Sequence, residues 1–332
     1  MAPSRIDSPV EAVGELSVAL QKKPTMYLLE KFPEEAVKYC QAHFHTILPL
    51  DEEVANWREN ADAILVREKI ITAQDISSAR RLRAIGKQGT GIDIIDKDAA
   101  DARGIAICNT PGVNAQSVAE LVLALTMAVA RQLRTISVKQ AAGNEVRKEH
   151  CMGMTLTGKS VGILGMGAIG TAVATMFRGA FGARVWAYDP FAPAKAWSDI
   201  EHTRVQNFEE MLPHVDVLTL HIPLNSQTQG LIGAKQLTAM KAGSILINVA
   251  RGGIVDEPAL IRVLNEGHLF GAGLDCHEEE PPTLQKHQAL WETGRVISTP
   301  HIGATTKETV VKTATSAIDN VLRHLSSTST VS

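Results

Sequence analysis

The chain has 332 residues, of which 45% are hydrophobic and 21% charged, and this length and composition are typical of a globular protein with two domains. A net charge of −3 without a run of lysine or arginine argues against a nucleic-acid partner, and no apolar stretch approaches the roughly twenty residues that a bilayer requires. Four cysteines without metal-ligand spacing suit a reducing compartment, so we expect a cytoplasmic protein that binds no metal and no membrane.

The first half of the chain alternates between expected strands and helices. A short amphipathic turn is expected at 13–20. Strands are expected at 26–29, 46–50, 63–66, 82–85 and 105–108, and helices at 33–43, 73–79 and 94–103. This alternation implies a parallel sheet with helices on both faces. Residues 114–142 then follow a helical pattern without proline and predict one long helix, which would suit a contact between domains or subunits.

The same alternation returns in the second half. Strands are expected at 161–164, 184–189, 216–222, 244–249, 270–274 and 295–298, and helices at 208–212, 235–240, 258–266 and 307–325. The last seven residues form a polar tail that we expect to be disordered. Two such series on either side of the long helix predict two doubly wound domains with a cleft between them.

A glycine-rich turn follows the strand at 161–164. Gly165, Gly167 and Gly170 have the spacing that permits a tight turn, close approach of a pyrophosphate, and close packing of a helix on a strand. Such turns also occur without a ligand. The next strand ends in Asp189, nineteen residues after Gly170, where an acid suits a ribose 2′-hydroxyl. The combination favours a dinucleotide site.

Polar side chains follow three of the later strands, where a parallel sheet places its ligand-side loops. Arg251 precedes two glycines that let the backbone turn and approach a ligand closely, and a guanidinium there suits a carboxylate. The acidic segment 275–280 and His301 follow the next two strands. A surface arginine, a solvated acidic loop and a structural histidine are the alternative interpretations. A histidine paired with a carboxylate has its pKa raised into the range that acid–base catalysis uses.

The sequence resembles the D-isomer-specific 2-hydroxyacid dehydrogenases over nearly the whole chain after Thr25, and within them most closely the 3-phosphoglycerate dehydrogenase branch. The motifs that carry this resemblance are Gly86-Lys-Gln-Gly-Thr-Gly-Ile-Asp93, Asn109-Thr-Pro-Gly112, Gly162-Ile-Leu-Gly-Met-Gly-Ala-Ile-Gly170, His221-Ile-Pro-Leu-Asn225, Asn248-Val-Ala-Arg-Gly-Gly-Ile-Val-Asp256, Gly273-Leu-Asp275 with Glu279-Glu-Pro-Pro282, and Pro300-His-Ile-Gly-Ala304. The family's activity is the NAD-dependent interconversion of a 2-oxoacid and its D-2-hydroxyacid.

The resemblance implies three catalytic residues. His301 would exchange a proton with the substrate oxygen, Glu280 would hold and stabilise the imidazole, and Arg251 would bind the carboxylate and polarise the carbonyl. It places the substrate beside Arg67, Lys87, Gly89, Thr90, Gly91, Arg251 and His301. It places the cofactor beside Thr90, Gly165, Gly167, Ala168, Ile169, Gly170, Asp189, Ile222, Pro223, Val249, Ala250, Arg251, Asp275, His301, Gly303 and Ala304.

The resemblance also implies an architecture. A flavodoxin-like substrate domain would comprise residues 1–112 completed by the C-terminal helix 307–332, and a Rossmann NAD-binding domain would comprise 113–306. Two subunits would form a homodimer, largely through the long helix that begins near Asn114. Because the acid at Asp189 repels a 2′-phosphate and no arginine follows nearby in the sequence, we expect NAD rather than NADP.

Several positions depart from the phosphoglycerate branch. Ala168 and Lys87 stand where that branch commonly has arginine, and Glu68 replaces a small polar residue where a phosphorylated substrate would bind. We therefore keep 3-phosphoglycerate, glyoxylate or hydroxypyruvate, and another 2-oxoacid as candidate substrates. An NAD(H)-sensing corepressor-like binding protein is the alternative function, because relatives with that role keep the same three catalytic residues.

Overall fold

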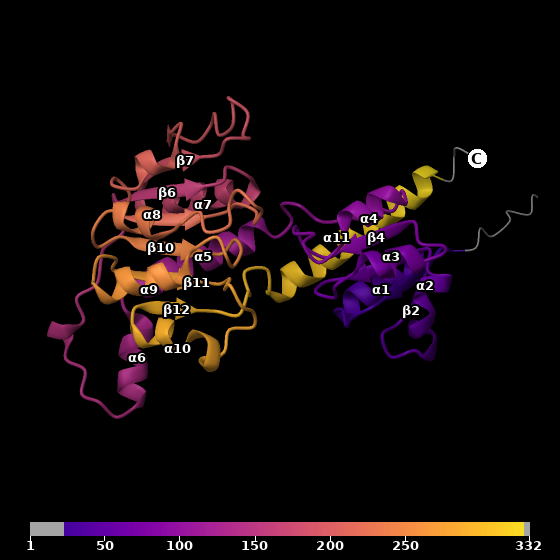
Figure 1. Cartoon of the computed structure of the whole chain (residues 1–332), viewed down its shortest axis with the longest axis horizontal. Helices are drawn as coiled ribbons and strands as arrows, with labels where there is room; N and C mark the ends of the chain where they lie inside the picture. Colours follow the sequence, from indigo (N-terminus) through magenta and orange to yellow (C-terminus); the bar gives the residue numbers. More distant parts are fainter. Residues whose placement is uncertain (1–22, 329–332) are drawn as a thin grey trace, which may run out of the picture.

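The computed structural model describes residues 23–328, and the amphipathic turn expected at 13–20 lies outside that range. Figure 1 shows two α/β lobes, which are joined by the segments that precede the helices α5 (Ala115–Ala130) and α11 (Lys307–Thr328). Each lobe contains one parallel sheet with helices on both faces. The expected fold class, two doubly wound parallel-sheet domains, is confirmed.

The first lobe is built on five parallel strands in the order β2-β1-β3-β4-β5, which is the flavodoxin-like order. Its elements are β1 (Thr25–Leu28), α1 (Glu34–His43), β2 (His45–Ile47), the 3₁₀ helix η1 (Glu52–Asn56), α2 (Trp57–Asn60), β3 (Ala63–Val66), α3 (Ala73–Ser78), β4 (Ala84–Lys87), α4 (Lys97–Ala102) and β5 (Ala106–Cys108). The helices α2, α3 and α4 cover one face of the sheet, and α1 and α11 cover the other.

The helix α11 returns to the first lobe from the far end of the chain. Its buried side chains Ala317, Ile318 and Val321 pack in one core with Met26 and Leu65 of the sheet. Residues 326–328 continue this helix, so the expectation of a disordered tail is wrong for them, and residues 329–332 of that tail lie outside the described range. The return of α11 agrees with the expected composition of the substrate domain, whose boundaries at 112 and 307 stay predictions.

The second lobe contains seven parallel strands in the order β12-β11-β10-β9-β6-β7-β8, the Rossmann order with one additional strand. Its further elements are α6 (Leu133–Ala141), η2 (Lys148–His150), β6 (Ser160–Leu164), α7 (Ala168–Phe181), β7 (Arg184–Tyr188), β8 (Thr203–Arg204), η3 (Phe208–Met211), β9 (Val217–Leu220), α8 (Ala234–Ala239), β10 (Ile245–Asn248), α9 (Glu257–Asn265), β11 (Gly271–Leu274), α10 (Leu284–Glu292) and β12 (Val296–Ser298). The helices α5 and α7 cover one face, and α8, α9 and α10 cover the other.

The prediction of one long helix over 114–142 is wrong. The chain bends by 63° between α5 and α6, and Gln132 at the junction has a left-handed backbone with φ of 53°. A segment twenty or more residues further along contacts the break: the Met154 N–H donates to the Ala130 carbonyl at 2.7 Å, and the Gln132 side chain donates to the Met152 carbonyl at 2.8 Å. The first bond satisfies a carbonyl at the end of α5, and the second holds Gln132 against the same segment.

The helix α6 extends away from the second lobe (Figure 1). None of its residues is buried, and the apolar side chains of Leu133 and Val138 are exposed. Among residues 23–328, no single helix has the length and apolar composition to cross a bilayer, although α5 and α6 taken together meet that test across their bend.

Candidate active site

The three loops that carry the expected catalytic residues meet at one edge of the second sheet. The strands β10, β11 and β12 are neighbours in register, with Asn248 opposite Leu274 and Leu274 opposite Ser298. Their carboxyl ends therefore lie side by side, and the chain continues from them into Arg251, Glu280 and His301. The expectation that these residues follow strand ends is confirmed; their catalytic roles stay predictions.

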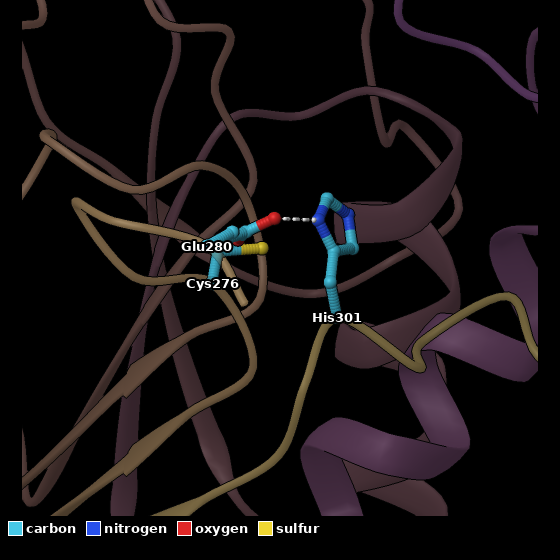
Figure 2. Close-up of side chains that lie close together, drawn as sticks. All are labelled: Cys276, Glu280 and His301. Carbon is cyan, nitrogen blue, oxygen red and sulfur yellow. Dashed lines mark hydrogen bonds and ion pairs between the residues drawn. The ribbon is translucent and has the colours of Figure 1, made fainter. Parts of the chain in front are cut away.

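Glu280 and His301 form a hydrogen-bonded pair. The His301 Nδ1 lies 3.0 Å from the Glu280 Oε2, and Cys276 lies beside them (Figure 2). Cys276 and Glu280 raise the pKa of His301 to about 10, although burial acts in the opposite direction. Burial raises the pKa of Glu280, but its bond to His301 and the imidazole charge outweigh burial and hold that pKa below its ordinary value. Both shifts favour an imidazolium–carboxylate pair.

Asp275 holds the His301 loop in place. Its buried carboxylate accepts hydrogen bonds from the Thr299 hydroxyl at 2.6 Å and from the N–H groups of Ile302 and Gly303 at 2.8 Å. The His301 N–H donates to the Asp275 carbonyl at 2.8 Å, and the His301 backbone has φ of 57°, an uncommon conformation for a residue with a side chain. Asp275 thus positions the imidazole, while its predicted contact with the cofactor stays a prediction.

Arg251 bridges the two lobes. Its Nε and Nη2 donate to the Asp93 Oδ2 of the first lobe at 3.2 and 3.1 Å, and its Nη1 donates to the Ala250 carbonyl at 2.7 Å. A Cβ at position 91 would overlap the guanidinium, so the arginine can lie against this loop only because residue 91 is glycine. No role was expected for Asp93 from the sequence, although it ends the 86–93 motif.

Gly252 makes a different close contact from the one expected. The sequence suggested that the glycines after Arg251 let the backbone approach a ligand, but an added Cβ at Gly252 would overlap the His277 carbonyl of the neighbouring loop. The His277 N–H in turn donates to the Glu280 Oε1 at 3.2 Å. Gly252 therefore permits the Arg251 and Glu280 loops to pack against each other.

We expect Gly252→Ala to lower kcat and to destabilise the fold by about 1–3 kcal/mol, because backbone must move to admit the methyl group. Gly179 is the matched control, because a Cβ there has open space inside the helix α7, and alanine is expected to leave turnover unchanged and the thermal midpoint equal or higher. Thermal unfolding and steady-state rates of both variants check this. Parental behaviour of Gly252→Ala would contradict the packing described.

The loop at 89–91, which the resemblance places beside the substrate, has two free N–H groups. The Gly89 N–H donates to the Thr110 hydroxyl at 3.0 Å and is not available to a substrate carboxylate. Across the described residues 23–328, the Thr90 and Gly91 N–H groups have no acceptor and can bind a carboxylate. Lys87 is buried nearby, where its amine donates to the Gln88 carbonyl at 2.6 Å, and burial together with the Arg251 charge lowers the pKa of Lys87 to about 8.

Arg67 is held locally. Its Nε lies 3.1 Å from the Glu68 Oε1, and its backbone N–H donates to the Glu30 carboxylate at 2.6 Å. The Lys69 N–H donates to the same carboxylate at 3.1 Å. The carboxylates of Glu30 and Glu68 also lie near enough to Lys87 to act on its charge. Acidic groups therefore lie near Arg67 and Lys87, the two cations of the first lobe that the resemblance assigned to the substrate.

The glycine-rich turn has the shape that a dinucleotide requires. Gly165 has φ of 97°, and a Cβ there would overlap the His221 carbonyl, while a Cβ at Gly170 would overlap the Gly165 carbonyl. A Cβ at Gly167 would meet nothing within 4 Å, so the backbone is open to a pyrophosphate at that point. The helix α7 begins directly afterwards with Ala168 and directs its free N–H groups at this space. The residues present fit NAD.

Asp189 lies at the end of β7, and its carboxylate accepts the N–H groups of Met166 at 2.9 Å and Phe191 at 2.9 Å. The expectation that no arginine lies near Asp189 is wrong for the folded chain. Arg204 on the edge strand β8 donates to the Asp189 backbone carbonyl at 3.0 Å and to the Ala192 carbonyl at 2.7 Å. Arg204 donates to loop carbonyls and forms no ion pair with the Asp189 carboxylate within residues 23–328, and the contact of Asp189 with the ribose stays a prediction.

The remaining predicted cofactor residues also follow strand ends of the second sheet. Ile222 and Pro223 follow β9, Val249 and Ala250 follow β10, and Gly303 and Ala304 follow β12. Together with the Asp189 loop they line the carboxyl edge of one sheet, which is where ligands of doubly wound folds bind. Their individual contacts stay predictions.

Comparison with known proteins identifies related chains. Residues 123–303 match the family model "D-isomer specific 2-hydroxyacid dehydrogenase, NAD binding domain". A D-3-phosphoglycerate dehydrogenase of Methanocaldococcus jannaschii is 38% identical over 77% of this chain, which spans about half (48%) of that relative's length. A hydroxypyruvate reductase of Thermotoga maritima is 34% identical over 92% of this chain and 96% of its own. The crystal structure of the TT0316 protein from Thermus thermophilus superposes with a TM-score of 0.80 at 33% identity, covering 91% of this chain and 97% of that one.

Proposed function

The chain belongs to the D-isomer specific 2-hydroxyacid dehydrogenases, and from this premise we propose that it interconverts a 2-oxoacid and the corresponding D-2-hydroxyacid with NAD. The observation that carries the proposal is the Glu280–His301 pair, set beside Arg251 at the carboxyl edge of an NAD-binding sheet. Steady-state oxidation of NADH with a panel of 2-oxoacids tests it. Turnover with at least one acid supports the enzyme, and NADH binding without turnover on any acid supports the corepressor-like alternative.

The side chains divide the chemistry between them. Arg251 and the N–H groups of Thr90 and Gly91 bind the substrate carboxylate, and Arg251 also polarises the adjacent carbonyl. The bound NAD supplies or accepts the hydride. His301 gives a proton from its Nε2 to the ketone oxygen during reduction and takes it back during oxidation, while Glu280 keeps its bond to Nδ1 and stabilises the imidazolium.

We propose an unphosphorylated 2-oxoacid, such as hydroxypyruvate or glyoxylate, in preference to a phosphorylated one. Arg67 is paired with Glu68, and Lys87 is desolvated in the neighbourhood of Glu30 and Glu68. A phosphate dianion would meet these carboxylates and find no unengaged arginine among the substrate residues predicted on the first lobe. The relative named hydroxypyruvate reductase supports this preference, whereas the relative named D-3-phosphoglycerate dehydrogenase does not.

We expect Glu68→Ser to shift the preference toward a phosphorylated acid. Removing one exposed carboxylate releases Arg67, and it should change the ratio of kcat/KM for the phosphorylated and unphosphorylated acids by about two- to fivefold, as for other exposed charge pairs. The measurement is the ratio of kcat/KM for phosphohydroxypyruvate to that for hydroxypyruvate. Glu34→Ser, at an exposed position of the helix α1, changes the net charge equally and should leave the ratio unchanged. An unchanged ratio in Glu68→Ser would remove this residue from substrate selection.

We also propose a homodimer in the cytoplasm. The helix α6 buries none of its own residues, and it exposes Leu133 and Val138 together with Met152 of the following segment, as expected for a surface that a second copy covers. All four cysteines are unpaired, which suits a reducing compartment. Sedimentation equilibrium should give a dimer that Leu133→Glu with Val138→Glu converts to monomer. A monomeric parent chain would refute the proposed assembly.

A further inference from the structure

We propose that Cys276, Glu280 and His301 form a binding site for a thiophilic divalent cation, Zn²⁺ in the first place, and that the bound ion blocks turnover. The sulfur, carboxylate oxygen and imidazole nitrogen of these residues all lie within 4.8 Å of one another. Figure 2 shows the thiol and the carboxylate on the same side of the imidazole. The inhibitory part rests on the proposed function, whereas the binding site does not.

The three donors come from two loops that the fold already holds together. Cys276 and Glu280 lie on the loop after β11, and His301 lies on the loop after β12, which Asp275 fixes by its hydrogen bonds. Cys276 is 1% exposed, whereas the side chains of Glu280 and His301 are 36% and 43% exposed. An ion can therefore approach from the solvent side of the histidine and carboxylate, and it meets the thiol at the inner end of the site.

The spacing of the donors is close to that of a tetrahedral zinc site. With Zn–S near 2.3 Å and Zn–N and Zn–O near 2.1 Å, tetrahedral ligand atoms lie roughly 3.4–3.6 Å apart. The His301 Nδ1 and the Glu280 Oε2 are 3.0 Å apart, and no pair of donor atoms exceeds 4.8 Å. The upper limit of 4.8 Å exceeds the tetrahedral separation by about 1 Å, a difference that changes in side-chain torsions can accommodate.

The donor set selects the class of ion. A thiolate and an imidazole are the ligands that Zn²⁺ prefers, whereas Mg²⁺ and Ca²⁺ are bound by oxygen ligands. Asp275, the acid next to Cys276, is committed to the Thr299 hydroxyl and two backbone N–H groups, and Glu279, the acid next to Glu280, pairs with Lys286. The ion thus has three ligands from the protein, and a fourth position is left for water or for a carboxylate of the substrate.

Metal binding at this place is incompatible with proton transfer by His301. Binding releases the Cys276 thiol proton and the proton on the His301 Nδ1, and it draws Glu280 from the imidazole to the ion. The imidazole then keeps one proton on Nε2, and donating it would leave an imidazolate. Sequence spacing alone argued against a metal site, because Cys276 and His301 are 25 residues apart and meet only through the pairing of β11 with β12.

The binding test uses the full chain, stripped with a chelator and then titrated with Co²⁺ and Zn²⁺ alone. We expect one metal ion per chain at this site, with a near-ultraviolet thiolate-to-cobalt absorption that Zn²⁺ abolishes. Cys276→Ser should lose the absorption and bind Zn²⁺ at least tenfold more weakly, whereas Cys151→Ser, at a half-exposed thiol elsewhere, should keep both. Absence of metal binding by the parent chain, or an absorption that survives in Cys276→Ser, would overturn the proposal.

Two further measurements separate this site from the other possibilities. His301→Asn keeps the thiol, so weaker Zn²⁺ binding by this variant shows that the imidazole is a ligand even if Cys276→Ser folds poorly; unchanged binding overturns the site. In the NADH assay, Zn²⁺ should inhibit the parent chain reversibly. When the rates of each protein are normalised to its own uninhibited rate, the inhibition constant of Cys276→Ser should be at least tenfold higher than that of the parent chain. Binding of Zn²⁺ without inhibition would overturn only the proposal that the bound ion blocks turnover. If the chain showed no turnover with any acid, the proposed function would fail, and the Co²⁺ absorption would still test the binding site.

Discussion

Replacement of His301 by alanine is expected to lower kcat for 2-oxoacid reduction by about 100- to 10,000-fold, the usual contribution of a positioned general acid. The variant retains Arg251 and the glycine-rich turn, so substrate and NADH still have their main binding groups. Steady-state rates at saturating 2-oxoacid, with NADH affinity measured separately by fluorescence titration, separate the loss of chemistry from a loss of binding.

His45→Ala is the matched control, because His45 is an exposed histidine on β2 of the first lobe and lies outside the site. It should retain the parental kcat. If His301→Ala also kept a rate within a few fold of the parent, another group would have to supply the proton, and the catalytic assignment of the Glu280–His301 pair would fail.

Replacement of Glu280 by glutamine is expected to move the pH profile of reduction. Reduction needs the imidazolium, and Cys276 and Glu280 raise the pKa of His301 to about 10, so the parental rate should stay level through neutral pH and fall as the pH rises through that value. Glutamine keeps the size of the side chain but removes the negative charge. The falling limb should therefore move down by more than about one pH unit, toward the ordinary histidine value near 6.5.

The rate of the reverse reaction should depend on pH in the opposite direction. Oxidation of the hydroxyacid needs the neutral imidazole, so its rate should rise with pH in the parent chain and reach its plateau at lower pH in Glu280→Gln. Glu279→Gln is the matched control, because that carboxylate pairs with Lys286 instead of with the histidine. A falling limb at the same pH in the parent chain and in Glu280→Gln would show that the carboxylate does not set the protonation of His301.

The positions of the catalytic residues could be predicted because they follow from strand order. Arg251, Glu280 and His301 each come shortly after an apolar stretch, and parallel strands bring all such positions to one edge. What the sequence did not contain is which strands are neighbours. The pairing of β10, β11 and β12 converts three separate strand ends into one site.

Contacts between distant segments account for the errors. At the break between α5 and α6 the Met154 N–H satisfies the Ala130 carbonyl and the Met152 carbonyl accepts the Gln132 side chain, and the local pattern contains no sign of these distant partners. Arg204 lies on a two-residue edge strand that is too short for any periodicity, and only its pairing with β7 brings it beside Asp189.

Two glycines that the sequence placed near a ligand also make protein contacts that the sequence did not reveal. The Gly89 N–H is taken by Thr110, and Gly252 makes room for the His277 carbonyl rather than for a ligand. A glycine in a sequence indicates that something approaches closely or that the backbone has an unusual conformation. It does not identify what approaches, because that group comes from another part of the chain.

The most direct test of the proposed activity is chiral analysis of the hydroxyacid formed with NADH, using 2-oxoacids whose reduction creates a stereocentre. Oxidation of one NADH should yield one molecule of the D-2-hydroxyacid with at least one acid of the panel, and His301→Ala should suppress both changes together. Saturable NADH binding without consumption of any acid, or accumulation of the L-isomer, would contradict the assignment of this chain as an NAD-dependent D-2-hydroxyacid dehydrogenase.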